Sequence, residues 1–373
     1  ANTDNNANAA PDWNATGNTA TVQAAQIAAK LDAGISVTIT TGGGSGAQDG
    51  DITVAASILK SAGGDAALTL RAHDQITLNN NVEIASTAGR LDVTLNSDLD
   101  GAGGGSITLN TGSAIRSNGG DVTLGGGADP STTAALGGAT STAYGVSLNN
   151  AAIDSAGGAI SIRGEGRSGA PNTVTARHGV IVQGGSVVTS GGGAVSVVGQ
   201  GGVATGGAGR DANYGVFVTG ANSRIESAAG TVNVTGTGGG NRDNNRGVYL
   251  NGANARITSV TGAIAVTGTS QGTGTGNEGV RLEAGSRVES TGGGAVAVSG
   301  TGGAGTAANY GVRLLGANTR IAGTTGAVSV TGTGQGTGAN NAGVRMETAS
   351  AVQSTSGAIS VTGTGGAGTN ANY

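Results

Sequence analysis

The sequence predicts an all-β fold, a right-handed parallel β-helix of about ten stacked three-stranded coils. The dipeptide Gly-Val recurs at intervals of 34, 36, 32, 32, 32 and 32 residues, starting from Gly145. Each interval holds three short runs in which apolar residues alternate with polar or small ones, the pattern of half-buried strands. No interval holds a stretch of about 10–12 residues with helical periodicity. A period of this length with three strand-like runs is typical of a β-solenoid.

The three runs of one unit are clear in the repeat that starts at Gly279. They cover residues 280–282, 287–290 and 295–298. Joined by tight turns, they make one triangular coil, and successive coils stack about 4.8 Å apart through parallel strand pairing. Equivalent residues then form three interior columns: Val146, Val180, Val216, Val248, Val280 and Val312; Ile153, Val188, Ile225, Ile257, Val288 and Ile321; Ile160, Val195, Val232, Ile264, Val296 and Val328. Such β-branched residues suit a stacked, pleated surface.

The composition agrees with a narrow interior. Of 373 residues, 77 are Gly, 3 are Pro, none is Cys, and aromatic residues make up 2%. Collagen is excluded because Gly has no three-residue period. Disulfides, zinc–thiolate sites and thiol nucleophiles are excluded because the chain has no Cys. The net charge of -4 comes with no basic stripe, so no nucleic acid partner is predicted. No apolar run approaches the roughly 18 residues of a transmembrane segment.

The coils extend upstream of the Gly-Val marker. Runs at residues 52–54, 76–78 and 107–109 start three earlier units, which makes ten coils counted from Ile52. Residues 21–33 (TVQAAQIAAKLDA) predict a helix that is a small lid or a bridge from a preceding segment, with Gly34 as its C-terminal cap. We divide the chain into an irregular segment with a short helix (1–34), a first set of coils (35–127) and the Gly-Val array (128–373).

A weaker 64-residue period lies over the 32-residue one. The segment GVYLNGANARI from Gly247 matches GVRLLGANTRI from Gly311 better than either matches its neighbour. The last residue, Tyr373, stands where the next Gly-Val is expected, so we expect an array that is truncated within a repeat.

The stretch DITVAASILKSAGGDAALTLRAHDQITLNNNVEIASTAGRLDVTLNSDLDGAGGGSITLNTGSAIRSNGGDVTLGGG, residues 51–127, resembles filamentous-haemagglutinin-like exoproteins of Gram-negative bacteria. The later array resembles them more loosely. The resemblance implies a large, extracellular β-helical protein of the bacterial outer cell surface, exported by two-partner secretion. The NPNG and NPNL motifs of the family's secretion domain are absent from the sequence, so we expect an internal segment.

Candidate binding residues gather where the third run of one coil leads to the first run of the next. The intervals 97–106, 125–145, 164–179 and 236–247 vary most and leave from one corner, which predicts a ridge of loops. Beside it, one column places Tyr144, His178, Tyr214, Arg246, Glu278, Tyr310, Ala342 and Tyr373 before each Gly-Val, and another places Phe217, Tyr249, Arg281, Arg313 and Arg345 on the first strand. Rings beside Arg and Asn are typical of a carbohydrate or protein contact surface. The surface candidates are Tyr144, His178, Tyr214, Phe217, Arg246, Tyr249 and Tyr310; in the alternative interpretation these side chains pack on neighbouring corners.

Two further patterns carry charge. Arg224, Arg256, Arg287 and Arg320 align on the second strand, with Glu226 and Glu289 nearby to offset their repulsion. This predicts either a solvated charge ladder or a track for an anionic glycan. Asp98 and Asp100 start a DxDG sequence and are candidate calcium ligands, although the distal Glu of an EF-hand is missing; turn-forming Asp is the alternative. No other cofactor is expected.

Catalysis has little support, because His73 and His178 fall in different coils without a matched partner. The leading hypothesis is a non-enzymatic adhesive shaft for attachment and biofilm formation, with a carbohydrate or protein as its partner. The alternative is a self-assembling extracellular filament whose open ends stack coil on coil. A polysaccharide lyase or hydrolase is the minor alternative.

Overall fold

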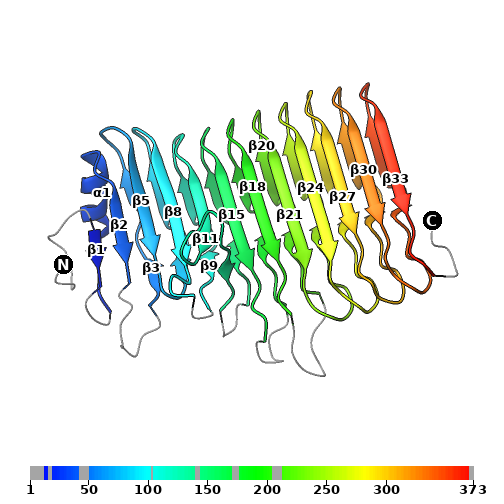
Figure 1. Ribbon diagram of the computed structural model, residues 1–373. Coiled ribbons are helices and arrows are strands. Elements are labelled where there is room, and N and C mark those ends of the chain that lie inside the picture. The colour runs from blue at the N-terminus through cyan, green and yellow to red at the C-terminus, as the bar shows by residue number, and fades with distance from the viewer. Residues whose placement is uncertain are drawn as a thin grey trace.

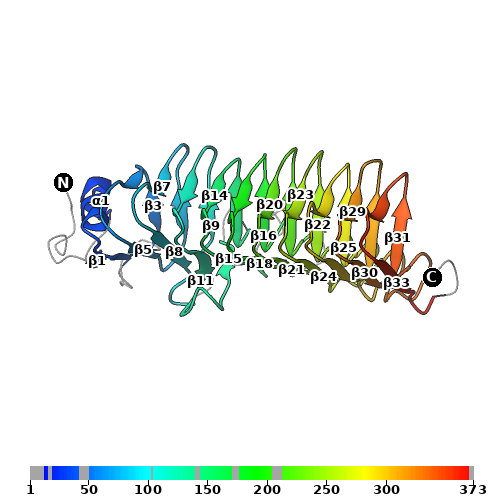
Figure 2. The same cartoon turned by 90° about the horizontal axis from the view of Figure 1, so that it is seen from above.

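The protein is a rod of three parallel β-sheets, as the sequence predicts (Figure 1). This computed structural model describes residues 12–15, 19–41, 50–101, 104–138, 143–169, 176–203 and 212–368. Each coil contributes one strand to each sheet, here named sheets A, B and C. Figure 2 shows the strands of sheet A along one side of the rod and those of the other two sheets away from it. The β-helix fold class is therefore confirmed.

Among the described residues, sheet A has 13 strands, and sheets B and C have ten each. Sheet A comprises β1 (Asp12–Asn14), β2 (Val37–Thr40), β5 (Ala66–Arg71), β8 (Leu91–Ser97), β11 (Val122–Gly126), β12 (Ala135–Leu136), β15 (Ile160–Glu165), β18 (Val195–Gln200), β21 (Val232–Gly238), β24 (Ile264–Ser270), β27 (Val296–Thr301), β30 (Val328–Thr333) and β33 (Ile359–Thr364). Sheet B comprises β3 (Ile52–Val54), β6 (Ile76–Leu78), β9 (Ile107–Leu109), β13 (Val146–Asn149), β16 (Val180–Gln183), β19 (Val216–Thr219), β22 (Val248–Asn251), β25 (Val280–Glu283), β28 (Val312–Leu315) and β31 (Val344–Glu347). Sheet C comprises β4 (Ile58–Lys60), β7 (Glu83–Ser86), β10 (Ala114–Arg116), β14 (Ala152–Asp154), β17 (Val187–Thr189), β20 (Arg224–Ser227), β23 (Arg256–Ser259), β26 (Arg287–Ser290), β29 (Arg320–Gly323) and β32 (Ala351–Ser354).

The register of the strands confirms the three predicted interior columns. In sheet B, Val216 pairs with Val248 and Val248 with Val280, and the same one-coil steps join the other members. In sheets C and A, Ile225 pairs with Ile257 and Val232 with Ile264. All of these side chains are buried. Because equivalent residues stack directly, one narrow apolar core runs along the rod.

Close stacking also explains part of the Gly content. At one corner, Gly193, Gly230, Gly262 and Gly294 lie above one another. A Cβ atom on Gly230 would collide with the carbonyl oxygen of Gly193, one coil earlier. The corner therefore excludes a side chain at these four levels.

The N-terminal end of the core is covered by the helix α1 (Ala24–Asp32), which lies at that end of the rod in Figure 1. The helix begins three residues later than the sequence suggests, because Gln23 has an extended backbone. Its Ile27 and Leu31 are buried, and Gly34 follows it with φ of 72°, the left-handed conformation expected of a C-terminal cap. Asp32 accepts hydrogen bonds from the backbone N–H groups of Ser61 and Ala62 at 2.6 and 2.9 Å, which tie the helix to β4.

At the other end, the last described coil leaves apolar side chains uncovered. Met346, Ile359 and Val361 are among the large hydrophobic residues that are exposed. The described part of the chain has no helix that is both long and apolar enough to cross a bilayer.

Candidate binding surfaces

The loops predicted to form a ridge do leave from one corner, between a strand of sheet A and the next strand of sheet B. Figure 1 shows these connections along the lower edge of the rod. Within 125–145, residues 135–136 form the short strand β12, which pairs with β15. The interval 236–247 is described throughout, whereas residues 102–103, 139–142 and 170–175 of the other three lie outside the described residues. Ligand binding by this ridge stays a prediction.

The seven surface candidates stand in two adjacent columns beside this corner. The rings of Tyr144, His178 and Tyr214 stack face to face, with centroids 5.1 and 4.7 Å apart and nearly parallel planes. Phe217 and Tyr249 stack at 4.9 Å, and Tyr214 contacts both edge-on. Tyr373, the last member of the first column, lies outside the described residues.

These side chains are far less exposed than a contact surface would require. His178, Tyr214, Tyr249, Tyr310 and Arg246 are buried, and Tyr144 and Phe217 are partly buried. Burial lowers the pKa of His178 to about 3, so its imidazole is neutral at physiological pH and accepts a hydrogen bond from the backbone N–H of Tyr214 through Nδ1. The geometry favours the alternative interpretation, packing against neighbouring coils. A binding role for the seven residues stays a prediction.

The ring column continues into a buried charge cluster. The Glu278 carboxylate is fully buried and contacts three guanidinium groups: Arg246 at 2.5 Å, and Arg281 and Arg313 at 3.1 Å each. Burial alone would raise the pKa of Glu278, but the three guanidinium groups outweigh it and hold the pKa below its ordinary value. Arg246 also donates a hydrogen bond to the Tyr214 hydroxyl at 2.8 Å. The cluster joins three coils on the outer side of sheet B.

An asparagine ladder lies directly beside this column, and the sequence analysis missed it. The backbone N–H of each of the first four Asn residues donates to the Oδ1 atom of the Asn one coil further on, at 2.9–3.0 Å. The ladder comprises Asn213, Asn245, Asn277, Asn309 and Asn341, all buried. The signal was present in the sequence as Asn-X-Gly-Val at 32-residue intervals. The ladder fixes the corner from which the loops leave, and with it the position of the rings.

Asp98 and Asp100, the calcium candidates, follow β8. Asp98 has φ of 50° and accepts a hydrogen bond from the Gly104 backbone N–H at 3.3 Å, which agrees with the turn-forming alternative. In the described part of the chain, no group of three or more His, Cys, Asp or Glu side chains is placed to hold a metal ion. Calcium binding at Asp98 and Asp100 stays a prediction.

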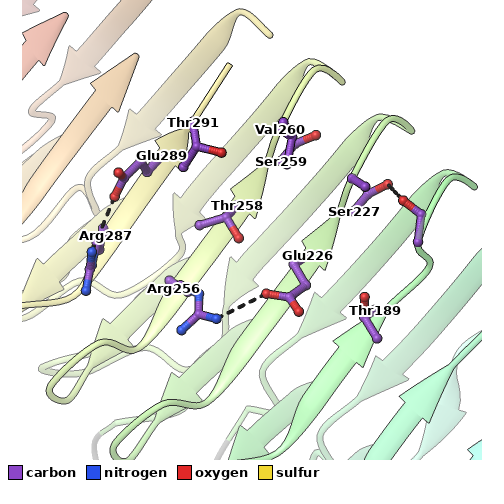
Figure 3. Close-up of a pocket in the computed structure, with 12 residues that line it drawn as sticks. Thr189, Glu226, Ser227, Arg256, Thr258, Ser259, Val260, Arg287, Glu289 and Thr291 are labelled. Carbon is purple, nitrogen blue, oxygen red and sulfur yellow. Dashed lines mark hydrogen bonds and ion pairs between the residues drawn. The ribbon is translucent and has the colours of Figure 1, made fainter. Parts of the chain in front are cut away.

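The outer face of sheet C carries a shallow groove of about 390 Å³ across β17, β20, β23 and β26 (Figure 3). The predicted arginine column is confirmed by the register, which pairs Arg224 with Arg256, Arg256 with Arg287, and Arg287 with Arg320. The groove is lined by Arg256, Arg287, Glu226, Glu289, Ser and Thr side chains, with Val260 at its edge.

The two glutamates of this patch, Glu226 and Glu289, are each shared between two arginines. Glu226 contacts Arg224 at 2.9 Å and Arg256 at 3.2 Å. Glu289 contacts Arg320 at 2.8 Å and Arg287 at 3.6 Å. The predicted offset of the like charges is therefore confirmed. Because two carboxylates face four guanidinium groups, this patch has a local excess of positive charge.

No protein-family model matches the chain, and no curated protein is similar to it in sequence. The β-helix is compatible with a repeat segment of a large exoprotein.

Proposed function

We propose that this chain is a structural and adhesive shaft of a secreted bacterial surface protein. In this role it is not an enzyme: it holds binding surfaces away from the cell and mediates attachment to cells or surfaces during biofilm formation. The observation that carries the proposal is the unbroken strand register, which continues through all ten strands of sheets B and C. Each coil adds about 4.8 Å of length, so reach grows with the number of coils.

Two outer faces support the adhesive part of the proposal. The corner between sheets A and B carries the variable loops, and sheet C carries the polar groove. The loops recur from coil to coil and the groove spans four strands, so several weak contacts to one surface would act together and raise the overall affinity.

The test is to display the chain on non-adherent bacteria and to measure attached biomass. Two neighbouring substitutions separate folding from surface charge. Val266→Asp places a charge in the buried core of β24 and should abolish attachment together with folding. Thr267→Asp, on the exposed face of the same strand, should leave both unchanged. If the folded wild-type chain, displayed at the same level as Thr267→Asp, gives no more biomass than the empty carrier, the proposal is wrong.

Head-to-tail filament assembly, the alternative function, meets an obstacle at the N-terminal end. In such a filament the last coil of one copy would stack on the first coil of the next. The helix α1 covers that position, with Ile27 and Leu31 buried beneath it. Sedimentation at high concentration tests the alternative, and a concentration-dependent increase in length would favour it over the shaft.

A further inference from the structure

The groove on sheet C has a two-coil period. Glu226, Thr258 and Glu289 occupy the same position on consecutive strands, and Ala322 follows them. A carboxylate is therefore present at every second level, while an arginine is present at all four. This alternation is the structural counterpart of the 64-residue period in the sequence.

Thr258 marks the level within the groove where the carboxylate is missing. Figure 3 shows Thr258 between the strands that carry Glu226 and Glu289, with Arg256 on its own strand and Arg287 on the next. The Thr hydroxyl is a small, neutral hydrogen-bonding group. The site therefore combines two guanidinium groups with room for an acidic group that the protein does not supply.

The arginines keep donors that the surrounding protein does not use. Within the described part of the chain, the Nε–H groups of Arg287 and Arg320 are shielded from water and have no hydrogen-bond partner. Buried N–H groups are normally paired, and a guanidinium presents its donors in a planar fork that matches a carboxylate. A carboxylate in the groove would contact the exposed edges of the Arg256 and Arg287 guanidinium groups, whose side chains keep 27% and 25% exposure.

The spacing indicates which acidic ligand fits. Levels without a protein carboxylate recur every second coil, about 9.6 Å apart at the usual strand spacing. This is close to the length of one disaccharide in an extended polysaccharide. A polymer that runs parallel to the rod axis would then bring one acidic group to Thr258, between two arginines, and the next to Ala322, beyond the groove, where Arg320 is followed by Ala351.

We propose that the groove on sheet C binds a linear polysaccharide with one carboxylate per disaccharide, seated between Arg256 and Arg287 at Thr258. This inference rests on the proposed attachment function and names the ligand class of one surface. The hydroxyl groups of Thr189, Thr258 and Thr291 line the groove and would contact the sugar hydroxyls. Since the whole chain has a net charge of -4, recognition depends on the local arginines and not on long-range attraction.

The test is calorimetric titration of the intact chain with three probe polymers. These are a polysaccharide with one carboxylate per disaccharide, a neutral polysaccharide of equal length, and a densely sulfated one. Wild-type protein should bind the first, should not bind the neutral polymer, and should lose affinity as salt rises from about 0.05 to 0.5 M, where the Debye length becomes short.

Thr258→Glu fills the missing level with a carboxylate and should weaken binding about tenfold or more, because it places like charges together. Its matched control, Thr267→Glu, adds the same charge to the exposed face of sheet A and should change affinity less than about twofold. Arg287→Gln, which removes one guanidinium without filling the site, should also weaken binding. Circular dichroism checks that each variant is folded.

The inference would be overturned by no binding of the carboxylated polymer, by equal binding of the neutral polymer, or by unchanged affinity in folded Thr258→Glu. The inference would also be overturned if the densely sulfated polymer bound more tightly than the carboxylated one, with the same affinity for wild type and Thr258→Glu. Recognition would then depend on charge density and not on the spacing of the levels that lack a carboxylate. If displayed Thr258→Glu still promotes attachment like wild type, the groove assignment fails while the proposed shaft function stands.

Discussion

The outer faces of sheets B and C use the same charged residues in stacked columns, yet they form opposite kinds of surface. On sheet B, Glu278 is fully buried and is contacted by three arginines. On sheet C, the side chains of Glu226 and Glu289 keep 24% and 18% exposure, and each contacts two arginines. Stacked rings and the asparagine ladder flank the sheet B cluster, whereas small Ser and Thr side chains flank that of sheet C. The side chains around an ion pair thus determine whether it is buried, as at Glu278, or accessible in a groove, as on sheet C.

The largest expected effect comes from removing the buried carboxylate. Glu278→Gln leaves three guanidinium groups near one another in a buried position and should lower the free energy of unfolding by about 3–5 kcal/mol. The matched change on sheet C, Glu289→Gln, should lower it by about 0–1 kcal/mol, because that pair is partly solvated. Urea denaturation followed by circular dichroism compares the two. Equal losses would show that the two faces do not differ as the burial indicates.

The asparagine ladder should contribute less, but still measurably. Asn277→Ala removes the acceptor of the Asn245 backbone N–H and leaves that donor buried, which should destabilise the protein by about 1–3 kcal/mol. The control is Asn233→Ala on the exposed face of sheet A, where the next two coils already carry Ala265 and Ala297. If both variants unfold at the same urea concentration, the ladder does not stabilise the corner.

The effect that is smallest near neutral pH, and that grows as the pH falls, is a pH dependence that involves only the sheet B side. The folded pKa of His178 is about 3, below its value of about 6.5 in an unfolded chain, so the unfolded state takes up the proton first. The stability contribution is complete above pH 6.5 and is lost as pH falls toward 3, by at most about 1.4 kcal/mol per pH unit. His178→Phe keeps a ring in the stack but cannot be protonated.

The measurement is the slope of unfolding free energy between pH 5 and 6.5, where ordinary carboxylates remain ionised. Wild type should have the steeper slope. Equal slopes in both proteins would mean that His178 is protonated without loss of the fold.

The sequence alone predicted the strands and the stacking order, because both follow from periodicity. Val248 and Val280 are one repeat apart, and in a solenoid that spacing places them in contact. The pairing of Glu226 and Glu289 with the arginine column was predictable for the same reason. Spacing does not determine how deeply a corner residue is buried, so the sequence left open whether Tyr214 and Tyr310 form a contact surface or pack on neighbouring corners. The ladder was overlooked because its bonds depend on backbone N–H direction, which residue identity does not reveal. The missing carboxylate at Thr258 could be interpreted as a ligand site only when the structure showed Arg256 and Arg287 beside it.

The 64-residue alternation also constrains how such an array can change its number of copies. Gain or loss of two coils by recombination keeps Glu and Thr alternating along sheet C. Gain or loss of a single coil brings two carboxylate levels, or two levels without one, into direct contact. Related proteins with longer or shorter rods should therefore differ from this one by steps of two repeats. The unit that is gained or lost is then two coils, although the structural repeat is one coil.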